Sequence, residues 1–136
     1  MSENKAPARW RREVSARLPW VLAAVTFGLA AFAARYGLTG WSSKYLGVTC
    51  WATMIYFWLL AALPALSLRR AALVAVAGCW LAEFAQLTWL PAYLSSQHIL
   101  LRFIFGATFN PPDLLAYVIG VLLGILAAAG LKWSAG

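Results

Sequence analysis

Hydrophobic residues gather into four long segments, and most charged residues lie in the short stretches between them. The segments cover residues 19–34, 48–66, 71–90 and 113–131. A helix needs about 20 apolar residues to cross the hydrocarbon core of a bilayer. The pattern therefore predicts an all-α membrane protein in which residues 19–132 form a four-transmembrane-helix bundle.

Helix-breaking residues mark the expected ends of these segments. Pro19 suits a first helical turn, and Pro91 is expected to close the third segment. Asn110, followed by two prolines, predicts the start of the fourth helix, because Asn caps helices and proline is tolerated in the first turn.

The stretch 91–112 is unusual for a loop. Its apolar residues 99–105 surround Arg102, and they are too few to span a bilayer. An interfacial or re-entrant segment is therefore expected between helices three and four.

Composition excludes an ordinary soluble domain. Of 136 residues, 63% are hydrophobic and 11% charged, with a mean hydropathy of +0.75. So short a chain has too high a surface-to-volume ratio to hide this much apolar surface from water. Cys50 and Cys79 lie inside predicted helices without a paired His or Cys motif, so neither a metal site nor another cofactor is predicted.

Charge asymmetry predicts an orientation. Residues 1–18 form a basic tail, and this tail, the 69–70 turn and Lys132 together hold eight Lys and Arg residues, against three in the other connections. Because basic residues favour the cytoplasmic side, both termini are expected there, with the tail against anionic lipid. No nucleic-acid motif accompanies the tail, and the first helix is expected to be retained rather than cleaved as a signal peptide.

Two pairs of polar residues stand inside the membrane segments. Glu83 and Gln86 share one side of the third segment, and Asp113 and Tyr117 share one face of the fourth. A charged side chain at mid-bilayer costs about 2.5 to 3.5 kcal/mol on an insertion scale. These groups are therefore expected to find partners inside the bundle.

Small residues recur every four positions along the fourth segment, at Ala116, Gly120, Gly124 and Ala128. This spacing lets two membrane helices approach closely. The fourth helix is thus expected to pack on a neighbour, with Asp113 and Tyr117 pointing into the bundle.

The polar and basic residues assigned to the outer side predict one outward-facing pocket, with His98 near its rim. Its expected lining residues are Arg35, Lys44, Glu83, Gln86, Arg102, Asp113 and Tyr117. The alternative is that these acids have purely structural roles. Glu83 would then hold two helices together by pairing with Arg35 or Arg102, and Asp113 would complement the helix dipole.

The order of several short motifs resembles a bacterial membrane family, domain of unknown function 2809, itself distantly similar to the VanZ-like membrane proteins. The likeness spans about residues 30–128 and rests on Arg35-Tyr36-Gly37-Leu38, Lys44-Tyr45-Leu46-Gly47, Trp51-Ala52, Glu83-x-x-Gln86, Phe109, Asp113-Leu114-Leu115-Ala116-Tyr117 and Gly120.

That resemblance implies four membrane helices in the bacterial inner membrane and no established activity. It matches the family's acid in the third helix to Glu83 with Gln86, and its Asp-x-x-x-Tyr to Asp113 and Tyr117. Val48 stands where the family would have an acid. The VanZ-like link implies a cell-envelope role, by analogy only.

Three functions remain open from the sequence. The first is binding of an anionic lipid-linked or envelope ligand by Arg35, Lys44 and Arg102, with Glu83 orienting them. The second is an accessory subunit, or a homo-oligomer, that packs through the 120–124 seam. The third is an intramembrane acid/base enzyme using Glu83 or Asp113, although no nucleophile elbow, metal-binding helix motif or phosphate loop is present. A transporter is less favoured, because four helices leave little room for an inverted repeat.

Overall fold

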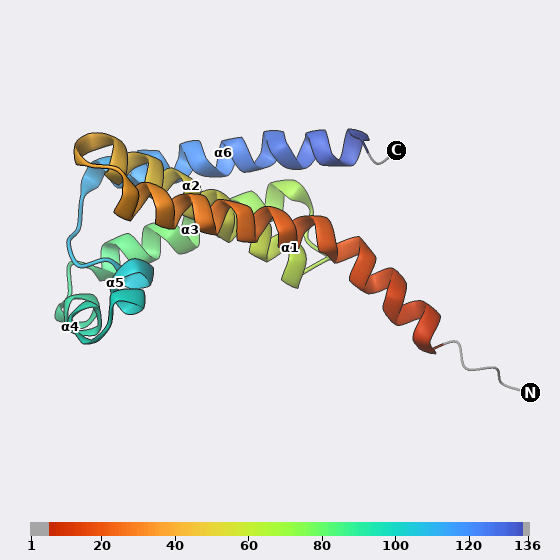
Figure 1. Cartoon of the computed structure of the whole chain (residues 1–136), viewed down its shortest axis with the longest axis horizontal. Helices are drawn as coiled ribbons and strands as arrows, with labels where there is room; N and C mark the ends of the chain where they lie inside the picture. Colours follow the sequence, from red (N-terminus) through yellow and green to blue (C-terminus); the bar gives the residue numbers. More distant parts are fainter. Residues whose placement is uncertain (1–5, 135–136) are drawn as a thin grey trace, which may run out of the picture.

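The computed structural model describes residues 6–134, and all regular secondary structure in this range is helical. The helices are α1 (Ala6–Gly37), α2 (Gly40–Ala62), α3 (Leu68–Ala85), α4 (Trp89–Gln97), α5 (Ile99–Phe105) and α6 (Pro111–Ser134). The long helices α1, α2, α3 and α6 pack into one bundle, while α4 and α5 lie together at one end of it (Figure 1). The predicted all-α class is confirmed.

Among the described helices, α1, α2 and α6 are each long and apolar enough to cross a membrane. The fourth helix of the bundle, α3, meets this description only together with α4, from which it is bent by 90°. It carries three charged residues, Arg69 and Arg70 near its start and Glu83 near its end. Its 18 residues still extend about 27 Å, close to the thickness of a bilayer core.

The first helix is longer than predicted. It runs from Ala6 and includes the described part of the expected basic tail; residues 1–5 lie outside the described range. Pro19 is inside α1 rather than in its first turn, so that expectation was wrong. Proline removes one backbone hydrogen bond, and the turns before it still form a helix, with an i,i+4 ion pair of 3.2 Å between Arg9 and Glu13.

The second helix also begins earlier than the predicted residue 48. Only Leu38 and Thr39 separate it from α1, and Gly40, at φ +66°, supplies the backbone conformation that this tight connection needs. Lys44 therefore lies on a helix rather than in a loop.

The end of the third segment was misplaced. Backbone hydrogen bonds of the i→i+3 type, from Gln86 to Glu83 (3.1 Å), Leu87 to Phe84 (3.1 Å) and Thr88 to Ala85 (2.9 Å), tighten and end α3. Pro91 belongs to the first turn of α4, where a missing N–H leaves no helical carbonyl unsatisfied. The expected interfacial or re-entrant segment is thus two short helices joined at His98.

The small-residue face of α6 packs against α2. A Cβ added to Gly120 would lie 2.3 Å from the backbone oxygen of Thr49, and one added to Gly124 would lie 2.6 Å from the ring of Tyr56. The Thr53 hydroxyl donates to the carbonyl oxygen of Gly120 at 2.7 Å. Ala116 and Ala128 are buried on the same face. Gly120 and Gly124 thus lie against α2 of the same chain, and all four small residues of this face are buried. Assembly with another subunit through the 120–124 seam stays a prediction.

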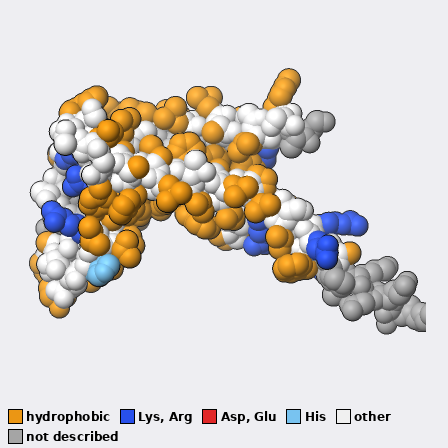
Figure 2. Space-filling view, viewed as in Figure 1, with side chains coloured by type: hydrophobic (Ala, Val, Ile, Leu, Met, Phe, Trp, Pro, Cys, Tyr) orange, Lys and Arg blue, Asp and Glu red, His pale blue; other side chains and the backbone are white. Residues whose placement is uncertain are grey.

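The outside of the bundle is apolar over its length, as a lipid-facing surface requires. Figure 2 shows hydrophobic side chains along the helices, with Lys and Arg gathered toward the two ends. The start of α1, the end of α6 and the turn between α2 and α3 lie at one end, and α4 and α5 lie at the other (Figure 1). This arrangement fits an even number of crossings. The cytoplasmic location of the termini stays a prediction.

Candidate functional site

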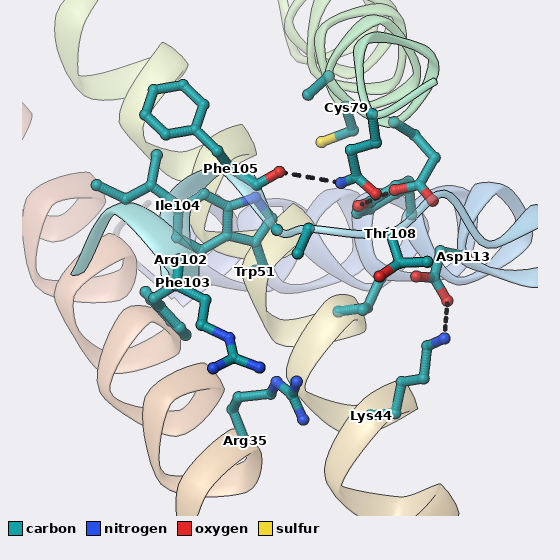
Figure 3. Close-up of a pocket in the computed structure, with 18 of the residues that line it drawn as sticks. Arg35, Lys44, Trp51, Cys79, Arg102, Phe103, Ile104, Phe105, Thr108 and Asp113 are labelled. Atoms are coloured by element: carbon teal, nitrogen blue, oxygen red, sulfur yellow. Dashed lines mark hydrogen bonds and ion pairs between the residues drawn. The ribbon is translucent and has the colours of Figure 1, made fainter. Parts of the chain in front are cut away.

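A cavity of about 470 Å³ lies at the end of the bundle next to α5. Residues of α1, α2, α3, α5 and α6 and of the connection 106–108 line it (Figure 3). They include each of the seven residues predicted to form a pocket: Arg35, Lys44, Glu83, Gln86, Arg102, Asp113 and Tyr117. The structure brings these side chains together; their role in ligand binding stays a prediction.

Glu83 is fully buried, with no exposed surface, and both of its carboxylate oxygens accept hydrogen bonds. The backbone N–H of Asn110 donates to Oε1 at 2.6 Å, and the Tyr117 hydroxyl donates to Oε2 at 3.0 Å. Since a buried carboxylate is tolerated only when hydrogen-bonded, these two contacts explain how α3 accommodates an acid. They also tie α3 to the start of α6.

The expected ion pair of Glu83 with Arg35 or Arg102 is not formed. Within residues 8–134, the ion pairs join Arg9 to Glu13 and Lys44 to Asp113. The backbone N–H and the phenol already occupy both oxygens of Glu83. The clamp interpretation was therefore right that Glu83 fastens helices together and wrong about its partners.

Asp113 joins the first turn of α6 to α2. Its Oδ1 lies 3.9 Å from Nζ of Lys44 and also accepts a hydrogen bond from the side chain of Asn110. The carboxylate is buried, whereas the Lys44 side chain is 42% exposed. Asp113 also lies in the first turn of α6, where a carboxylate complements the positive end of the helix dipole.

Gln86 joins the end of α3 to the end of α5. Its amide Nε2 donates to the carbonyl oxygen of Phe105 at 3.0 Å. The next residue, Gly106, has φ +63°, and a Cβ there would lie 2.7 Å from Gln86 Nε2. The carbonyl of Gly106 accepts from the Ser95 hydroxyl of α4. Gly106 is thus required both for its backbone conformation and for this close approach.

The arginines on α1 and α5 form the cationic part of the site. Their guanidinium groups, of Arg35 and Arg102, point toward one another in Figure 3. Neither lies in an ion pair with a carboxylate of the described residues. The neighbouring Phe103 holds α5 against α1 and α2, because its ring packs on Phe32 and Trp51. Its ring centroid lies 5.5 Å from that of Phe32 and 5.1 Å from that of Trp51.

The remaining candidates have structural positions. His98 does not line the cavity; its Nδ1 accepts the backbone N–H of Leu100 at 3.1 Å and so caps α5. Cys50 and Cys79 are free thiols, and within the described residues no cluster of His, Cys, Asp or Glu is arranged to hold a metal.

Three structural residues of the site were missed by sequence reasoning. Asn110 was identified only as a helix cap, Gly106 was not singled out, and Phe103 was counted only among apolar residues. The glycine directly after the apolar run 99–105 was the available signal for a sharp turn. A backbone N–H as the partner of Glu83 left no signal in the sequence.

Chemically, the cavity combines two kinds of surface. Arg35 and Arg102 offer donors and positive charge, whereas the carboxylates of Glu83 and Asp113 are already engaged by groups of the protein. Apolar side chains, among them Trp51 and Phe103, separate and surround these groups.

Comparison with known proteins identifies a family but no closer relative. Searches of curated proteins and of solved structures find no match. A family model described as protein of unknown function (DUF2809) matches residues 37–121, which include every predicted pocket residue except Arg35. With its apolar helices and a match over more than half of its length, this chain is a membrane protein that belongs to the DUF2809 family.

Proposed function

We propose that this protein binds the phosphate group of a membrane lipid, or of a lipid-linked envelope compound, in the cavity beside α5. The observation that carries the proposal is the convergence of Arg35 and Arg102, from different helices, without an ion-pair partner among the described carboxylates.

Two guanidinium groups that face one another repel, and an anion between them would remove this repulsion. Each guanidinium presents five N–H donors in a planar fork that matches phosphate geometry, and such charge-assisted hydrogen bonds are among the strongest in proteins. Lys44 plays a different part, because Asp113 already balances its charge.

The surroundings of the arginines favour a lipid over a water-soluble anion. The α5 side of the cavity includes Ile99, Ile104 and Phe105, all exposed on the outside of the protein. In a membrane these side chains face acyl chains, so a lipid phosphate can reach the arginines while its tails stay in the bilayer. The cavity volume also falls within the range of about 300 to 1,000 Å³ that is usual for ligand sites.

Location follows from the charge pattern. We place the protein in the bacterial cell membrane with both termini in the cytoplasm, so that the cavity faces outward. A ligand there would belong to the outer leaflet or to the cell envelope, which agrees with the resemblance to VanZ-like proteins.

The test compares two double variants by native mass spectrometry of protein in mild detergent, equilibrated with phosphatidylglycerol. Arg35→Ala with Arg102→Ala removes the facing guanidinium groups, and Arg69→Ala with Arg70→Ala removes the same charge at the other end of the bundle. We expect the first pair to lower lipid retention at least about tenfold, because charge-assisted hydrogen bonds contribute about 1.5 to 3 kcal/mol each. The second pair should bind like the native chain.

Equal retention by both double variants would disprove the proposal. Co-purification of a foreign subunit in place of lipid would instead support an accessory role. An acid/base enzyme has less support, because both oxygens of Glu83 are held by structural partners and Asp113 is engaged by Lys44 and Asn110.

A further inference from the structure

We infer that a second cavity, at the end of the bundle that holds both termini, binds an anionic membrane lipid with two phosphates in one head group, as in cardiolipin. This cavity has a volume of about 380 Å³ and shares no lining residue with the one beside α5. Its walls come from α1, the end of α2, the 63–67 turn, the start of α3 and the end of α6, which meet at that end of the bundle (Figure 1). The inference does not depend on the proposed function.

The first step concerns charge, because two cations from different helices line this cavity. Arg17 of α1 and Lys132 of α6 are both exposed, so a ligand can reach them. Neither lies in an ion pair with a carboxylate of the described residues. Glu13 also lines the cavity, but Arg9 lies 3.2 Å from its carboxylate and offsets its charge. The cavity therefore keeps two positive charges that no described carboxylate balances.

The second step concerns the rest of the lining, which is mainly apolar. Leu60 is buried there, and Trp20 and Leu66 are half-buried. The Trp20 ring is held in place by stacking on the buried ring of Phe57, with centroids 6.1 Å apart. Tryptophan is enriched where lipid head groups meet acyl chains. An apolar interior beside unbalanced cations thus suits a molecule that has both acyl chains and negative charge.

The third step is the charge that such a lipid needs. One phosphodiester group balances one of the two cations, whereas a head group with two phosphodiesters balances both. The two phosphates are covalently joined, so binding of the first raises the effective concentration of the second. Basic pockets between transmembrane helices on the cytoplasmic side favour head groups of this kind, and this end of the bundle is expected to face the cytoplasm.

The experiment compares two double variants of the delipidated full-length protein by native mass spectrometry with cardiolipin. Arg17→Gln with Lys132→Gln removes both cavity charges and keeps the side chains polar. The matched control, Arg12→Gln with Arg69→Gln, removes the same charge from α1 and α3 outside the cavity. All four side chains are exposed, so both variants should fold.

We expect Arg17→Gln with Lys132→Gln to lower cardiolipin retention about tenfold, which corresponds to about 1.4 kcal/mol. The control should retain cardiolipin like the native chain. Equal retention by the two double variants would overturn the inference, because binding would then depend on no particular cation at this end.

Phosphatidylglycerol tests the need for two phosphates. It carries one phosphate, so its retention should depend much less on Arg17 and Lys132 than that of cardiolipin. An equal dependence for the two lipids would overturn the assignment of a two-phosphate head group.

Repeating the cardiolipin measurement in the Arg35→Ala with Arg102→Ala background separates the two cavities. Because they share no lining residue and lie at opposite ends of the bundle, the effects of the two pairs of substitutions should add. A dependence on Arg17 and Lys132 that disappears in this background would overturn the inference. If phosphatidylglycerol retention does not depend on Arg35 and Arg102 while cardiolipin retention depends on Arg17 and Lys132, the proposed function fails and this second site stands.

Discussion

Replacing Gly120 with alanine should force α2 and α6 apart. The new Cβ would lie 2.3 Å from the Thr49 carbonyl oxygen and 2.9 Å from the Ala52 Cβ. The nearest of these atoms belongs to the backbone, so rotation of a side chain cannot relieve the clash. Ordinary contact begins near 3.4 Å, and the two helices must therefore separate by about 1 Å.

That movement sets the magnitude of the effect. The hydrogen bond from Thr53 to the Gly120 carbonyl would lengthen from 2.7 Å to about 3.7 Å, beyond hydrogen-bonding range. Overpacking costs about 1 to 3 kcal/mol, and a lost interhelical hydrogen bond in a membrane protein about 0.6 kcal/mol. The matched control is Gly78→Ala, because Gly78 lies on an exposed face of α3 with nothing within 4 Å of its added Cβ.

Both variants gain the same helix propensity on replacing glycine with alanine, so the difference between them isolates the contact. We expect Gly120→Ala to unfold with a free energy about 2 to 4 kcal/mol lower than Gly78→Ala. The measurement is SDS-induced unfolding in mixed micelles, followed by tryptophan fluorescence. Equal unfolding midpoints for the two variants would show that the close α2–α6 contact is not present in the folded protein.

Three further outcomes are expected. Glu83→Gln should lower the free energy of unfolding by less than about 1.5 kcal/mol, because the amide oxygen of Gln can still accept from Asn110 and the Tyr117 hydroxyl can accept from the new NH2 group. Glu83→Leu should lower it by about 2 to 5 kcal/mol, because the Asn110 N–H and the Tyr117 hydroxyl would both be left without an acceptor. Similar losses for the two variants in the same unfolding assay would contradict this. Gly106→Ala should displace the Gln86 side chain and expose the end of α5 to limited proteolysis. A cleavage rate equal to that of the native chain would count against the close contact between Gln86 and Gly106. In cysteine-free protein, Ser134→Cys should stay unlabelled by an impermeant thiol reagent in intact cells while Thr39→Cys is labelled, and the reverse pattern would refute the orientation.

The sequence alone was enough to determine the fold class and the group of polar residues at the site. Hydropathy and segment length are local properties, so four apolar segments indicated a helical membrane bundle without knowledge of any contact. Polar groups such as Glu83 and Asp113 avoid lipid, so their convergence inside the bundle could also be predicted. The four-residue spacing of small residues likewise indicated which face of α6 would be buried.

Helix boundaries were less predictable, because they depend on hydrogen bonds that a hydropathy pattern does not contain. Gly40 starts α2 well before its apolar run begins, and the i→i+3 bonds after Glu83 end α3 before Pro91 is reached. Apolar length measures the part of a helix in lipid, whereas backbone hydrogen bonding continues into the interface and beyond.

Only the tertiary structure decided which groups became partners. Glu83 is held by the backbone N–H of Asn110, which lies 27 residues away and is a group that every residue except proline has, so composition could not single it out. The seam of α6 suits any close neighbour, and the fold filled it with α2 of the same chain. Arg35 and Arg102 were left facing each other because Phe103 seats α5 against α1 and α2, a contact that depends on three helices meeting in space. The sequence thus determined which polar and small residues must be buried. Packing between residues far apart in the sequence determined which groups they contact.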